Sequence, residues 1–145
     1  MKRMGILILA LTSALSATPA RADGLWSISE HTAETGHGGD VIGHMIYYAQ
    51  QASAGKRIIA PLKCYSACTE MLAFSANVCA DPYGAFYFHL PFNNQTGKRW
   101  TEAQALALYP PAVRRVIQAH GHLSATGWLK ISAGDFDIKI GGCDE

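Results

Sequence analysis

The sequence predicts a single small α/β domain in which helices alternate with short strands and the sheet has parallel character. Short apolar runs typical of buried strands alternate with segments of helical periodicity, and turn or helix-capping residues stand at many of the boundaries. The length of 145 residues suits one domain. An apolar fraction of 49% supplies a core and excludes a disordered chain.

The first 22 residues have the pattern of a secretory signal peptide. Lys2 and Arg3 form a positively charged start, and an apolar run over residues 5–17 follows. Ala20-Arg21-Ala22 places small residues where signal peptidase needs them, so we expect cleavage after Ala22. An uncleaved membrane anchor is the alternative, but the run is shorter than the ~20 residues that span a bilayer as a helix.

The mature domain is therefore expected to comprise residues 23–145 and to be periplasmic or secreted. No later segment has the composition of a membrane span, and no cysteine follows the cleavage site to carry a lipid. After cleavage we expect no membrane association. The mature part has 9 basic and 11 acidic side chains and no basic stripe, which excludes a nucleic-acid partner.

The N-terminal part of the mature chain is predicted to hold a strand, a turn and a helix. Residues 23–34 contain apolar side chains that suit the start of a strand, and residues 35–39 form a glycine-rich flexible turn. Asp40 suits a helix N-cap, and apolar side chains recur behind it at helical spacing, which predicts a helix over 41–53. Gly55 lies just past its end.

The middle of the chain alternates strands with a second helix. An isoleucine-rich run over 57–62 predicts a buried strand, and the apolar residues 67–76 predict a helix that starts directly after Ser66. Strands are expected at 78–79 and 85–89, on either side of an Asp-Pro-Tyr-Gly turn.

The C-terminal third is predicted to contain two helices and short strands. Thr101 and Gln104 form a capping-box pattern, and Pro111 suits the first turn of a helix. The expected elements are a polar loop over 91–99, helices over 102–108 and 112–120, a short strand at 128–131 and a last turn or strand within 135–140.

Ser66 is a candidate nucleophile because a serine between a strand and a helix projects from the sheet edge at a helix N-terminus. His89 closes a strand 23 residues later and could act as the general base. The backbone N–H groups of Ala67 and Gly39 could stabilise an oxyanion. The alternative is that Ser66 only caps the helix and His89 only ends the strand, since single serines and histidines are common.

The order of these motifs resembles the Clp-peptidase/crotonase-like superfamily. Gly-Gly before a helix, Cys64-x-Ser66-Ala67-Cys68-Thr69 after a strand and His89-Leu90-Pro91 at a strand end follow the order of Clp-type serine peptidases. The chain is also similar, over roughly residues 36–143, to small exported bacterial proteins of uncharacterised function with a Cys-x-Ser-Ala-Cys-Thr motif. The resemblance implies repeated strand–helix units, with Ser66 as nucleophile, His89 as base and Gly39 with Ala67 as oxyanion donors.

The sequence departs from that family at the third catalytic residue. Trp128 stands where Clp-type peptidases have their acid, and Asp135 and Asp137 are candidate replacements whose spacing fits less well. Loss of the acid alone costs ~10⁴ in turnover in a serine protease. The chain is also too short for the long helix on which Clp-type rings assemble, so any hydrolysis is expected to be independent of ATP.

Three functions follow from these observations and stay open at this stage. The first is a weak or vestigial serine hydrolase or peptidase that acts on a peptide or ester. The second is a non-catalytic binding or interaction module on the same scaffold. The third is a cell-envelope protein that forms homo-oligomers through its aromatic side chains.

No metal and no cofactor are expected. The chain has no His-Glu-x-x-His motif, so surface or capping roles are predicted for its remaining histidines, which are His31, His37, His44, His120 and His122.

The four cysteines fit two structural disulfides, for which three pairings are possible. Cys64 and Cys68 flank the turn at Ser66 and are close enough in sequence to bridge locally. The favoured pairing is therefore Cys64–Cys68 with Cys79–Cys143, and disulfides persist in an exported protein.

Overall fold

The computed structural model describes residues 35–36, 38–93 and 95–143. The predicted signal peptide, the predicted strand start at 23–34, His31 and His37 lie outside these residues. Helices and small, mostly parallel sheets alternate along the described chain, which confirms the predicted α/β class.

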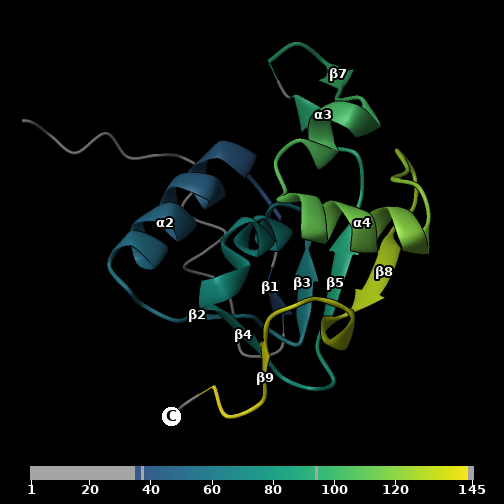
Figure 1. The fold of residues 1–145 in the computed structure, drawn as a ribbon. Coiled ribbons are helices and arrows are strands. Elements are labelled where there is room, and N and C mark those ends of the chain that lie inside the picture. The colour runs from purple at the N-terminus through teal and green to yellow at the C-terminus, as the bar shows by residue number, and fades with distance from the viewer. Residues whose placement is uncertain (1–34, 37, 94, 144–145) are drawn as a thin grey trace, which may run out of the picture.

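The larger sheet has four strands in the order β1-β3-β5-β8 (Figure 1). The first three strands are parallel to one another, and β8 is antiparallel to β5. Their bounds are Thr35–Gly36 (β1), Lys63–Tyr65 (β3), Ala85–Phe88 (β5) and Leu129–Ser132 (β8).

A second, parallel sheet has the order β2-β4-β9, and β6 and β7 form a small antiparallel hairpin. The strands are Ile58–Ile59 (β2), Val78–Ala80 (β4), Phe92–Asn93 (β6), Lys98–Arg99 (β7) and Lys139–Ile140 (β9). The helices are Val41–Ser53 (α2), the 3-10 helix Ser66–Asn77 (η1), Glu102–Leu106 (α3), Pro111–His120 (α4) and the 3-10 turn Ala133–Asp135 (η2).

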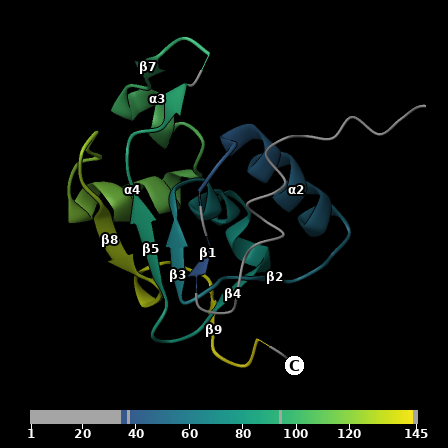
Figure 2. The same cartoon turned by 180° about the vertical axis from the view of Figure 1, so that it is seen from behind.

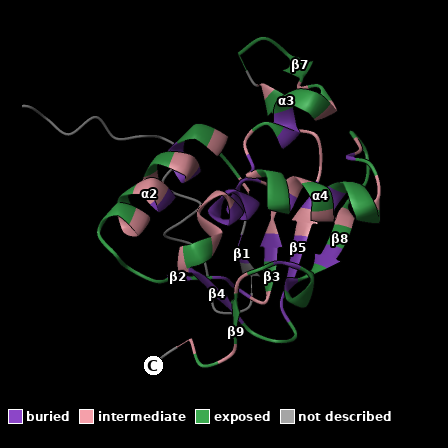
Figure 3. Cartoon of the chain, in the orientation of Figure 1, coloured by how far each residue is buried: buried purple, intermediate pink, exposed green. Residues whose placement is uncertain are grey.

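The helices α4 and η1 pack against one face of the larger sheet. Figure 1 shows α4 in front of β5 and β8, and the reverse view in Figure 2 shows these strands in front. The side chains on the helix side, Cys64, Phe86, Phe88 and Ile131, are buried. In Figure 3 most of β5 is buried, whereas β3 and β8 each have one buried residue. Together with the apolar side chains of the helices that pack on them, these residues form the core.

The predicted helix boundaries depend on capping residues, and the structure confirms them closely. Asp40 Oδ1 accepts a hydrogen bond from the N–H of Ile42 at 3.0 Å and starts α2 as an N-cap. Thr101 and Gln104 form the reciprocal capping box of α3. Pro111 is the first residue of α4.

The predicted strand over 57–62 is wrong as a single element. The chain pairs with β4 through β2 and then crosses to the larger sheet as β3. Pro61 lies between the two strands and has no N–H to donate to a ladder, which explains the break. Ser66 therefore follows β3.

Two segments predicted as irregular are partly strands. Thr35 and Gly36, expected in a turn, pair with β3. The expected loop over 91–99 is a hairpin, in which Asn93 Oδ1 accepts from the N–H groups of Gln95 and Thr96 at 2.9 and 3.0 Å. A turn of this kind uses the same polar residues as an irregular loop, so composition alone does not distinguish the two.

The structure confirms both predicted disulfides. Cys64 and Cys68 have Cα atoms 5.4 Å apart, and Cys79 and Cys143 have Cα atoms 5.6 Å apart. The second bond links β4 to the segment after β9. Two disulfides fit an oxidising compartment. Among the described residues, no helix has the length and hydropathy of a membrane span.

Candidate active site

Ser66 occupies a strained turn between β3 and η1. Its φ is 54°, and it is the one non-glycine residue with positive φ in the described part of the chain. That conformation costs free energy for a residue with a Cβ, and it exposes the side chain on a sharp strand-to-helix turn. The Cys64–Cys68 disulfide spans this turn, and the hydroxyl of Thr69 donates to the carbonyl oxygen of Ser66 at 2.6 Å.

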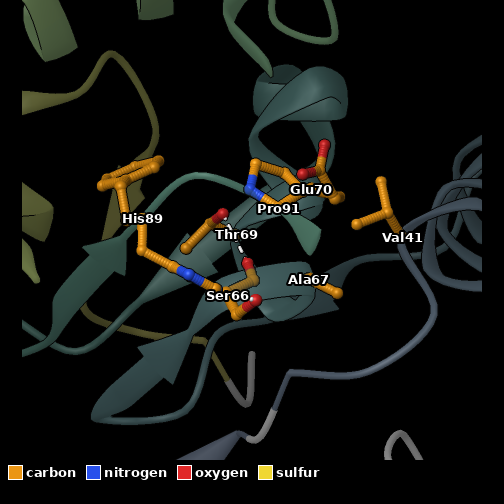
Figure 4. Close-up of a pocket in the computed structure, with 8 residues that line it drawn as sticks. Val41, Ser66, Ala67, Thr69, Glu70, His89 and Pro91 are labelled. Carbon is orange, nitrogen blue, oxygen red and sulfur yellow. Dashed lines mark hydrogen bonds between the residues drawn. The ribbon is translucent and has the colours of Figure 1, made fainter. Parts of the chain in front are cut away.

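Ser66 and His89 are in direct contact. The Oγ atom of Ser66 lies 2.6 Å from Nε2 of His89, which confirms the expected proximity of the two side chains. The register explains it, since Tyr65 of β3 pairs with Tyr87 of β5 and both reactive residues lie just past these paired ends. Figure 4 shows the His89 side chain pointing toward Ser66 at the mouth of a pocket.

The environment of His89 favours a neutral imidazole. Partial burial lowers the pKa of His89 below its usual 6.5, and the positive charge of Arg99 lowers it further. A neutral ring at pH 7 leaves one nitrogen without a proton. That nitrogen can accept the proton of Ser66 Oγ.

The other side of His89 meets an aromatic ring. The ring centroids of His89 and Trp128 are 4.5 Å apart, and within the described residues no carboxylate hydrogen-bonds to His89. The structure does not bring Asp135 to the site, because its carboxylate Oδ2 lies 3.3 Å from Nε2 of His120. Ser66 and His89 thus form a dyad.

Gly38 approaches Ser66 so closely that only glycine fits. A Cβ on Gly38 would lie 2.6 Å from Cβ and 2.9 Å from Oγ of Ser66. The neighbouring Gly39, the expected oxyanion donor, has φ of 151°, another conformation that favours glycine. The expected partner donor, Ala67, follows Ser66 and has its backbone nitrogen 3.6 Å from the same Cβ position. Two adjacent glycines in the sequence were the signal for this close approach.

A small pocket that is open to solvent lies beside the dyad. Its walls combine apolar and polar side chains, and Figure 4 shows Val41, Ala67 and Pro91 around it. The lining residues are Val41, Ser66, Ala67, Thr69, Glu70, Phe88, His89 and Pro91.

Glu70 is a buried acid in this pocket that sequence reasoning missed. It is 3% exposed, and burial raises its pKa to about 8, although its hydrogen bond with Tyr109 acts in the opposite direction. Tyr109 Oη lies 3.0 Å from Glu70 Oε1 and 2.8 Å from Thr69 Oγ1. Glu70 is the one charged residue in η1, and a single acid in an apolar helix was the available signal.

The other histidines with described positions lie outside the dyad. His44, expected on the surface or at a cap, is fully buried in α2, and its Nδ1 lies 2.8 Å from the carbonyl oxygen of Asp40. His122 Nδ1 lies 3.2 Å from Glu102 Oε2. Among the described residues, no group of three or more His, Cys, Asp or Glu side chains has a geometry that could hold a metal ion.

Comparisons with known proteins found no family model, no curated protein and no solved structure that matches this chain. Assignment of the site therefore depends on its geometry and chemistry.

Proposed function

We propose that the protein is an exported serine hydrolase that uses Ser66 as nucleophile and His89 as general base on a peptide or ester. The observation that carries the proposal is the 2.6 Å contact between Ser66 Oγ and His89 Nε2. The strained φ of Ser66 and the close packing of Gly38 support it, since strain of this kind clusters at reactive sites.

The proposed reaction follows the usual course of acyl transfer. His89 Nε2 takes the hydroxyl proton of Ser66 as Oγ bonds to the substrate carbonyl carbon. The oxygen that becomes negative faces the backbone N–H groups of Ala67 and Gly39. His89 then gives its proton to the leaving group, and water, activated by the same imidazole, releases the acid and restores Ser66.

The proposed activity is slow and independent of ATP. Without a carboxylate behind His89, the imidazole has no charged partner to hold its tautomer or to stabilise its protonated form. The resemblance to Clp-type peptidases is part of the same proposal, as are the cleaved signal peptide and a periplasmic or secreted location.

A non-catalytic binding module is the second candidate, and the ring of Trp128 at His89 is the observation that favours it. A substrate-like peptide or ester would then bind without turnover. Homo-oligomerisation is compatible with either candidate, and size-exclusion chromatography with light scattering tests it.

Ester hydrolysis by the oxidised mature protein tests the proposal. We expect slow release of p-nitrophenol from p-nitrophenyl acetate, lost in Ser66→Ala and in His89→Gln. Ser132→Ala removes an exposed serine outside the site and should retain the rate. A rate that survives Ser66→Ala would refute the role of Ser66. A folded wild-type protein without turnover would favour the binding module.

A further inference from the structure

A chain of hydrogen bonds connects Ser66 to the buried acid Glu70. It runs from the Ser66 carbonyl oxygen to Thr69 Oγ1 at 2.6 Å, then to Tyr109 Oη at 2.8 Å, and ends at Glu70 Oε1 at 3.0 Å. Thr69 and Glu70 are 2% and 3% exposed, and Tyr109 is also buried. These side chains are therefore largely shielded from bulk solvent.

A hydrogen bond at every contact of this chain requires one arrangement of protons. A carbonyl oxygen only accepts, so the single hydroxyl proton of Thr69 points to Ser66. If Glu70 is ionised, Tyr109 donates its phenol proton to Oε1, and the contact between Thr69 and Tyr109 has no proton. If the carboxyl group of Glu70 carries a proton and donates it to Tyr109, the phenol proton is free to bond to Thr69, and all three contacts are hydrogen bonds.

The second oxygen of Glu70 supports the same protonation state. Oε2 is buried and has no hydrogen-bond partner. Leaving one buried oxygen of a charged carboxylate without a hydrogen bond costs far more free energy than leaving the carbonyl oxygen of a neutral acid without one. The elevated pKa of Glu70, to about 8, agrees with this proton count.

We propose that Glu70 is a positioning residue that, as a neutral carboxylic acid, heads a hydrogen-bond chain through Tyr109 and Thr69 and so holds the nucleophile turn at Ser66. This inference rests on the proposed hydrolase. When Glu70 loses its proton, Tyr109 turns its phenol proton to the carboxylate, and the bond between Tyr109 and Thr69 is lost. The Ser66 turn is then held less firmly.

Other titratable groups lie on the elements that pack against η1. On α2, Tyr48 Oη has no hydrogen-bond partner, and Nδ1 of the buried His44 lies 2.8 Å from the carbonyl oxygen of Asp40. His89 lies across the pocket with its Nε2 on Ser66. In the described strands that pack against η1, Cys64 and Cys79 are in disulfides, and the other titratable side chains are Lys63 and Tyr65 of β3 and Tyr87 of β5, on the outer face.

The protonation state of Glu70 can be measured without any activity. The carboxyl carbon of Glu70 in ¹³C-labelled Ser66→Ala protein is followed by NMR, with Glu70→Gln for assignment; the chain has only five glutamates. We expect Glu70 to stay protonated at pH 7 and to titrate on the alkaline side. Titration of Glu70 near the usual glutamate pKa of about 4.3 would overturn the inference.

The effect on Ser66 is measured as the ratio of fluorophosphonate labelling rates at pH 9.5 and pH 7. In the wild type we expect the labelling rate at pH 9.5 to be about 5-fold lower than the rate at pH 7, which is the effect of one lost hydrogen bond. Glu70→Gln should abolish the fall, because its amide donates to Tyr109 at every pH. Glu102→Gln, at the start of α3 and outside this hydrogen-bond chain, should retain it.

Tyr109→Phe provides a second variant in case Glu70→Gln does not fold. Without the phenol, the ratio should no longer fall at alkaline pH. An alkaline fall of wild-type size in either variant would overturn the inference while the hydrolase stands. Absence of labelling at every pH would refute the hydrolase, and the NMR titration would still decide the state of Glu70.

Discussion

The imidazole of His89 lies against the indole of Trp128, with ring centroids 4.5 Å apart and a tilt of 59° between the rings. In a serine hydrolase with a triad, a carboxylate would orient the imidazole. Here an aromatic ring restricts its position by packing alone. The reactivity of the dyad therefore depends on the geometry of the Ser66 turn more than on charge behind the base.

Gly38→Ala is expected to abolish labelling of Ser66. The new methyl group would overlap Cβ and Oγ of Ser66, so the turn must move by an amount that breaks the contact with His89. We predict a loss of at least ~100-fold, the size expected when reacting groups are misplaced by about 1 Å. Gly134→Ala, where a Cβ meets nothing within 4 Å, is the matched control and should label like the wild type.

The rate of ester hydrolysis should rise with pH through an apparent pKa below 6.5. Protonated His89 cannot accept the Ser66 proton, and both burial and the charge of Arg99 lower the pKa of His89. Arg99→Gln should move the midpoint to higher pH, while Arg115→Gln, on the exposed side of α4, should leave it in place. An identical midpoint in Arg99→Gln would contradict this account of the base.

The two disulfides are expected to have separable effects. The Cys79–Cys143 bond closes a long loop, so replacing both residues with alanine should lower the free energy of unfolding by roughly 4 kcal/mol, as measured by urea denaturation. The Cys64–Cys68 bond spans only the Ser66 turn. The variant with alanine at both Cys64 and Cys68 should lose labelling of Ser66 even where it remains folded. Circular dichroism shows whether the protein is folded. Equal labelling by both double variants would contradict the separation.

The contribution of Glu70 to stability should decrease as pH rises from about 5 to about 8. The pKa of Glu70 is raised from 4.5 to about 8 in the folded state, so the folded protein binds more protons than the unfolded chain in this range. The resulting stabilisation is present at acidic pH and is lost as pH passes through the folded pKa. Denaturation of the wild type and of Glu70→Gln at pH 5.5, 7 and 8.5 measures it. A parallel pH dependence in the two proteins would be inconsistent with a raised pKa at Glu70.

Export is predicted to remove residues 1–22. Intact-mass measurement of protein recovered from the medium or periplasm should give a chain that begins at Asp23 and contains no free thiol. Recovery of the chain with Met1 from washed membranes would show that the segment is an anchor.

The proximity of Ser66 and His89 could be predicted from the position of each residue relative to a strand end. Ser66 stands at a strand-to-helix junction and His89 at a strand end, and parallel strands bring such positions to one sheet edge. The capping residues Asp40 and Thr101 fixed helix starts for the same reason, since each acts within a few residues.

The features that sequence reasoning missed depend on contacts distant in the chain. Pro61 divides one apolar run between two sheets, and only the paired strands show where each half belongs. Asp135 pairs with His120, which the spacing to His89 does not reveal. The importance of Gly38 and Glu70 comes from what packs against them, Ser66 in one case and Tyr109 in the other.

Peptide mapping of a fluorophosphonate adduct tests most directly whether Ser66 is a nucleophile that His89 activates. The oxidised mature protein is treated with the probe at pH 7.5, digested without reduction and analysed by mass spectrometry. We expect one adduct, on Ser66, that is absent in Ser66→Ala, strongly reduced in His89→Gln and retained in Ser132→Ala. A folded protein that carries no adduct, or an adduct on another residue that persists in Ser66→Ala, would contradict it.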